Sequence, residues 1–187
     1  MAKYIFTIIL FFLLPRCIYA QRLLKGQIGL EAVVGVVSDK KPLHDYYFIQ
    51  GGLTVNGKNG SYKFWGLEYV QKKYAFRDYD IPVESFTTEG GYSFPLLRDW
   101  GKNISLNMGL SAVIGYEVFN HGESLLSNGA VIKNKDSFIY GGGLRLTIET
   151  YVSDHILLIV QGKAKGVWGT SVEKVRPSAG LGLRYIF

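Results

Sequence analysis

Alternation of apolar residues with small or polar residues runs through most of the chain and limits its fold more than any other feature. Residues 104–118 show it best, because every second position is apolar: Ile104, Leu106, Met108, Leu110, Ala112, Ile114, Tyr116 and Val118. The positions between them carry mainly serine, glycine, asparagine and glutamate. A helix would mix the two sets, whereas a strand places them on opposite faces. The pattern therefore predicts β-strands.

Eight segments of this kind predict an all-β domain. They lie near residues 24–37, 46–56, 61–71, 82–95, 103–118, 137–152, 155–168 and 177–187. Two connections are short (57–60 and 153–154), one is intermediate (96–102), and four are longer (38–45, 72–81, 119–136 and 169–176). Short turns at one end and longer loops at the other are typical of outer-membrane barrels. We therefore expect an eight-stranded antiparallel up-and-down barrel with both termini at the periplasmic end.

The N-terminal residues have the features of a cleaved signal peptide, which we place at residues 1–20. Lys3 supplies the positive charge, residues 4–14 are almost wholly apolar, and Ala20 is a small residue of the kind found at cleavage sites. A membrane-anchoring helix is the competing interpretation, but the apolar run falls short of the roughly 20 residues needed to span a bilayer. The transmembrane barrel domain is then residues 21–187.

The polar face of the strands distinguishes a membrane barrel from a soluble lipocalin-like barrel or a β-sandwich. A soluble barrel would cover that face with charged residues, but here it carries mostly small ones: Ser85, Thr87, Glu89, Gly91 and Ser93 in one segment, and Ser178, Gly180, Gly182 and Arg184 in another. Small side chains suit the narrow interior of eight strands, which leaves no open channel. We therefore favour a membrane barrel whose apolar face contacts outer-membrane lipid, and keep the soluble folds as the alternative.

The last strand also contains an expected insertion signal. Leu183, Tyr185 and Phe187 lie on the apolar face, and Phe187 is the final residue. This ending resembles the C-terminal signal that the outer-membrane barrel assembly machinery reads. We expect that machinery to be a partner of the chain.

Charged residues on the inward face form the main candidate site. Alternation points nine of them into the lumen: Glu31, Glu68, Glu89, Glu117, Arg145, Glu149, Lys163, Lys165 and Arg184. Unpaired charges there would be unfavourable, so we expect a ladder of ion pairs, with Glu89, Arg145 and Glu149 deepest. The competing interpretation is that these charges are solvated at the barrel mouths, above all Glu117 and Lys165.

No catalytic, cofactor-binding or metal-binding residue is expected. His44, His121 and His155 lack the spacing of metal ligands. His121, Glu123 and Ser124 share the longest connection, yet polar residues so close in sequence rarely align as a triad. The formal net charge is +6, but the basic residues are scattered or paired on loops, as in Lys40-Lys41 and Lys72-Lys73, so direct nucleic-acid binding is not predicted. We also expect no small-molecule substrate.

An ordered set of short motifs resembles one known family. The motifs are Gln21-Arg22, residues 66–69 (GLEY), Ile81-Pro82-Val83, residues 86–92 (FTTEGGY), residues 115–117 (GYE), residues 128–130 (NGA), residues 138–142 (FIYGG), residues 149–151 (ETY) and Trp168-Gly169. In this order they are similar to the TraO family, conjugal-transfer proteins of Bacteroidetes conjugative transposons. Residues 162–165 (GKAK) depart from the mixed arginine and glutamate run expected there.

The resemblance implies a structural or assembly component of a conjugative, type IV secretion-like DNA-transfer apparatus in the outer membrane of a Gram-negative bacterium. Other proteins of that apparatus are the implied partners, and no enzymatic activity is implied. Two alternatives stay open. A stand-alone binding barrel, such as an adhesin or immune-evasion protein, would use the 119–136 loop as its functional surface. A lipid-modifying barrel enzyme would use His121 and Ser124.

Overall fold

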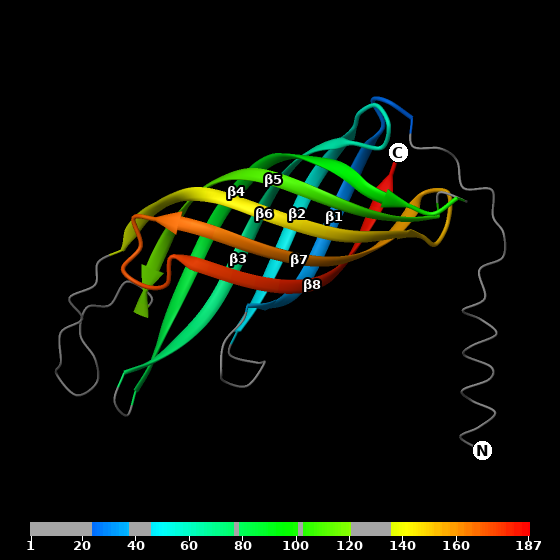
Figure 1. Ribbon diagram of the computed structural model, residues 1–187. Coiled ribbons are helices and arrows are strands. Elements are labelled where there is room, and N and C mark those ends of the chain that lie inside the picture. Colours follow the sequence, from blue (N-terminus) through cyan, green and yellow to red (C-terminus); the bar gives the residue numbers. More distant parts are fainter. Residues whose placement is uncertain (1–23, 38–45, 77–78, 101–102, 121–135) are drawn as a thin grey trace, which may run out of the picture.

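The chain folds into a closed barrel of eight strands, each antiparallel to its neighbours, with β8 paired to β1 (Figure 1). The computed structural model describes residues 24–37, 46–76, 79–100, 103–120 and 136–187. The strands are β1 (Ile28–Val37), β2 (Tyr46–Asn56), β3 (Tyr62–Phe76), β4 (Tyr79–Arg98), β5 (Ile104–Phe119), β6 (Ser137–Tyr151), β7 (Ile156–Trp168) and β8 (Val175–Ile186). The predicted fold class is confirmed. The expected signal peptide and residues 121–135 of the long loop lie outside the described residues.

The hairpin of β3 and β4 is longer than the sequence predicts, so the expected loop over residues 72–81 is wrong. The ladder continues to the pair Phe76 and Tyr79, and the hairpin extends past the neighbouring strands (Figure 1). Lys72-Lys73 suggests a loop in the sequence. However, Lys72 is a buried inward residue and Lys73 faces outward, so the alternation continues through both.

The register between strands fixes their tilt. Following paired positions from Val37 on β1 through β8, β7 and the remaining strands leads to Asn56 on β2. The backbone N–H of Asn56 donates to the carbonyl of Gln27, ten residues before Val37. A displacement of that size over eight strands corresponds to a tilt of about 40° from the barrel axis. Each residue along a strand then rises about 2.5 Å along the axis.

The interior is narrow enough that glycine is required where bulky side chains cross it. A Cβ atom added to Gly35 would lie 2.6 Å from Cε1 of Phe48, and one on Gly180 would lie 2.8 Å from its Cζ. Phe48 is itself 1% exposed and fills the lumen at that level. The small inward residues of the alternating pattern therefore leave room in the lumen for a few large inward side chains.

The outer surface is apolar and carries aromatic residues in two bands. Toward the longer loops, Tyr69, Phe86, Tyr116 and Phe138 follow one another as directly paired positions on β3 to β6. Tyr69 and Phe86 pack with ring centroids 5.0 Å apart. At the opposite end, exposed aromatic residues include Tyr92, Tyr185 and Phe187. Two aromatic bands around an apolar surface are typical of membrane-spanning barrels.

Candidate functional site

The lumen holds charged residues in three tiers, and each tier combines two acidic with two basic side chains. The lower tier, nearest the C-terminus, is Glu31, Arg145, Glu149 and Arg184. The middle tier is Glu68, Glu89, Lys163 and Lys165. The upper tier, at the mouth near the longer loops, is Lys72, Glu117, Glu173 and Arg176. Counted over the described residues, each tier is therefore neutral in formal charge.

The lower tier is built around two guanidinium groups. Arg184, which is 0% exposed, binds Glu149 through two parallel hydrogen bonds of 3.0 Å and donates from Nη2 to Glu31 at 2.7 Å. Arg145 donates to the other oxygen of Glu31 at 2.9 Å. The Tyr62 hydroxyl donates to Glu149 at 2.6 Å. The paired N–H donors of Arg184 match the geometry of the Glu149 carboxylate, which makes this contact a strong, charge-assisted one.

The middle tier is formed by two lysines of β7 between two glutamates. Lys163 binds Glu68 and, at 3.2 Å, Glu89. Lys165 binds Glu68 at 2.6 Å and the Thr87 hydroxyl at 3.1 Å. Residues 162–165, where the sequence departs from the expected family run, therefore supply both cations of this tier.

Two glutamines join the lower and middle tiers. Gln161 accepts from Arg145 at 3.3 Å and donates to Gln50 at 3.4 Å. The same Gln50 oxygen accepts from Lys163 at 2.9 Å. Hydrogen bonds thus run without a break from Glu149 to Thr87 through the barrel interior.

The upper tier attaches the β7–β8 turn to the barrel wall. Arg176 lies 2.5 Å from Glu117, which also accepts from the Thr170 hydroxyl at 2.6 Å. Lys72 of β3 binds Glu173 of the turn at 2.6 Å. Glu117 is therefore 0% exposed, and Lys165 below it is 5% exposed. The alternative that these two are solvated at the mouth is wrong, because the turn covers them.

The structure places all nine predicted charges in the lumen and gives each an oppositely charged partner. Sequence reasoning missed Lys72 and Arg176, although each continues the inward positions of its strand. It also missed Glu173, whose position in a turn carries no periodic signal. Leu183, Tyr185 and Phe187 lie on the outer surface and are between 47% and 68% exposed. Their role in insertion stays a prediction.

Side chains of the described residues fill most of the lumen. A cavity of about 20 Å³ between the middle and upper tiers, lined by Glu68, Lys165 and Arg176 among others, has room for one water molecule. Among the described residues, no group of three or more His, Cys, Asp or Glu side chains could hold a metal ion. No helix in the described part of the chain is long and apolar enough to cross a membrane.

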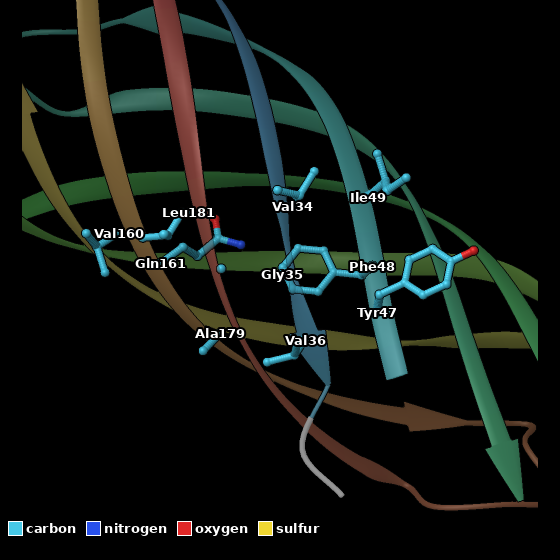
Figure 2. Close-up of a pocket in the computed structure, with 11 residues that line it drawn as sticks. Val34, Gly35, Val36, Tyr47, Phe48, Ile49, Val160, Gln161, Ala179 and Leu181 are labelled. Atoms are coloured by element: carbon cyan, nitrogen blue, oxygen red, sulfur yellow. The ribbon is translucent and has the colours of Figure 1, made fainter. Parts of the chain in front are cut away.

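A shallow groove of about 630 Å³ lies on the outer surface over β1, β2, β7 and β8 (Figure 2). Most of its side chains belong to outward positions, among them Val34, Ile49, Val160 and Leu181, while the inward residues Phe48 and Gln161 line its floor. Tyr47 supplies the one hydroxyl of the lining, and it donates to Gln71 at 2.7 Å. The groove therefore offers apolar contact and no reactive group.

The family of the chain follows from a match that includes every strand. The family model for conjugative transposon protein TraO matches residues 24–187. The chain belongs to the TraO family. No curated relative matches the sequence. The family match thereby confirms the resemblance to the TraO family that the short motifs of the chain predict.

Solved structures share the fold of this TraO-family chain at low sequence identity. Ail, the attachment invasion locus protein of Yersinia pestis, solved in complex with the heparin analogue sucrose octasulfate, is 12% identical, with a TM-score of 0.53 over 88% of this chain and 100% of its own. Neisserial surface protein A is 13% identical, with a TM-score of 0.52 over 86% of this chain and 96% of its own. The TraO-family barrel therefore has the architecture of outer-membrane barrels.

Proposed function

We propose that this chain is a non-enzymatic structural or assembly component of the conjugative DNA-transfer apparatus, inserted in the outer membrane. The family match over residues 24–187 carries this proposal. The apolar outer surface with its aromatic bands supports the location, since such a surface suits hydrocarbon flanked by headgroups. Export would depend on the N-terminal signal peptide, and insertion on the barrel assembly machinery.

The filled lumen limits how such a component can act. Three neutral tiers of paired charges occupy the interior of the barrel, so neither DNA nor a large solute passes through a single copy. The chain then contributes through its outer surface, its longer loops and its periplasmic turns. We expect the partners at these surfaces to be outer-membrane lipid and other proteins of the transfer apparatus.

A mating assay with an in-frame deletion tests the proposed function. The deletion should lower transfer frequency strongly, and the wild-type gene supplied in trans should restore it. A complementing variant with His121→Ala and Ser124→Ala should restore transfer equally well, because the proposal needs no catalytic group. Unchanged transfer in the deletion strain would contradict the proposal and favour a stand-alone binding barrel.

The location is tested separately by fractionation and gel electrophoresis without boiling. The folded barrel should be recovered with outer-membrane proteins and should migrate faster before heating than after it. Recovery as a soluble periplasmic protein would contradict the proposed location whatever the mating assay shows.

A further inference from the structure

The apolar part of the outer surface extends over different lengths of the barrel axis on different strands. On β7, every outward position is apolar from one end of the strand to the other: Ile156, Leu158, Val160, Gly162, Ala164, Gly166 and Trp168. These positions span twelve residues, or about 30 Å along the barrel axis. This side of the barrel matches a bilayer core of ordinary thickness, which is about 30 Å.

On β3, polar residues limit the apolar surface at both ends. The outward positions Trp65, Leu67 and Tyr69 lie between exposed Lys63 and half-buried Gln71. Lys63 and Gln71 are eight residues apart, or about 20 Å along the axis.

Neighbouring polar side chains extend the upper limit beyond β3. Gln71 accepts a hydrogen bond from Tyr47 of β2, and Glu84 of β4 accepts one from Tyr69 at 2.9 Å. Gln71 and Glu84 are themselves opposite one another in the ladder. The upper limit is therefore a polar cluster spread over three strands.

We propose that the bilayer is thinned beside β3, to a hydrocarbon thickness of about 20 Å against about 30 Å beside β7. A bilayer of full thickness would immerse Lys63, or Gln71 and Glu84, in hydrocarbon. The flexible Lys63 side chain can extend toward the nearer interface, but it is shorter than the roughly 10 Å by which the two thicknesses differ. Compressing the adjacent lipid chains satisfies both ends.

Tilting of the barrel does not explain the pattern, as a comparison of levels shows. Because the strands are tilted, a row of paired positions rises about 25 Å along the barrel axis in one full circuit of eight strands. Ala164 of β7 lies in the same row as Lys63, four strands further on, and so lies about 12 Å higher along the axis. Leu158 and Gly166 then lie within about 3 Å of the levels of Lys63 and Gln71. A tilt would expose one member of the β3 pair and immerse the other, whereas thinning exposes both.

Single-cysteine variants of residues 21–187 make a matched comparison possible, because the one cysteine of the chain, Cys17, lies in the expected signal peptide. Lys63→Cys and Gln71→Cys report on β3, and Leu158→Cys and Gly166→Cys report on β7 with the same separation. Gly166 has no atom within 4 Å of an added Cβ, so it accepts the change. Each variant carries a bimane label and is folded into dioleoylphosphatidylcholine vesicles.

Iodide, which stays in water, should quench both β3 labels several-fold more than both β7 labels. Equal shielding at all four positions would show a bilayer of full thickness and overturn the proposal. Exposure of one β3 label with shielding of the other would show a tilted barrel, and would overturn it as well.

A second measurement does not depend on labels. The double variant Lys63→Leu and Gln71→Leu lengthens the apolar surface of β3, so its folding yield across a series of lipid chain lengths should shift toward longer chains. Lys58→Leu, in the β2–β3 turn, is the control and should leave the profile unchanged. A double variant with the wild-type profile would contradict the proposal.

Discussion

Replacing Arg184 with methionine tests whether charge balance in the lower tier stabilises the barrel. Arg184 makes four hydrogen bonds to Glu31 and Glu149 and has no exposed surface. After the substitution, Glu31 retains Arg145, but Glu149 retains only neutral donors such as Tyr62. Removing one partner of a buried ion pair costs about 3–5 kcal/mol, because the other charge stays buried. We expect a loss of unfolding free energy in that range.

Urea titration of the barrel in lipid vesicles measures this loss, with the unboiled gel band reporting the folded fraction. Lys58→Met removes an exposed charge in the β2–β3 turn and should change the free energy by less than about 0.5 kcal/mol. Adding Glu149→Gln to Arg184→Met should recover part of the lost stability, since the tier again holds one acidic and one basic residue. A wild-type urea midpoint for Arg184→Met, or further destabilisation by Glu149→Gln, would refute the reasoning.

Three further substitutions test other parts of the structure. Gly35→Leu should abolish the compact gel band, because the leucine side chain would overlap Phe48. Gly51→Leu is the control and should fold, because a Cβ added there meets no atom within 4 Å. Equal folding yields of the two variants would contradict the packing argument. Deleting Phe187 should lower the amount of barrel in the membrane fraction, and a normal level would count against its role in insertion. Arg176→Gln should cost about 3 kcal/mol, because Glu117 is 0% exposed and stays buried without this guanidinium, although it keeps the Thr170 and Ser85 hydroxyls as donors. A wild-type urea midpoint for Arg176→Gln would contradict this expectation.

Strand number and the facing of side chains could be predicted from the sequence because the period of a strand is two. A shift by one residue would move Leu144 and Leu146 inward and Arg145 outward, so the pattern leaves one consistent choice. The same reasoning places Glu31, Arg145 and Arg184 inside without any knowledge of their partners. Periodicity, however, says nothing of the height at which each strand sits.

The partners of the lumen charges could not be predicted because they depend on the displacement between strands. Arg145 of β6 contacts Glu31 of β1 across the lumen, 114 residues away in the sequence. A displacement other than ten residues would bring a different carboxylate to that level. Lys72 was missed for another reason: the Lys72-Lys73 pair suggests a loop, and its partner Glu173 lies in a turn without any periodic pattern.

The pairing of Glu31 with Arg184 has a consequence for how the barrel closes. These two residues are direct register partners on the first and last strands, so their ion pair spans the seam. Until β8 reaches β1, Glu31 lacks the guanidinium that neutralises the lower tier together with Arg145. The pairing of β8 with β1 and the neutralisation of the lower tier by Arg184 therefore occur in the same step. Opening the barrel at this seam must break the backbone pairing of β1 with β8 together with the buried ion pair between Glu31 and Arg184. The ion pair therefore stabilises the closed barrel.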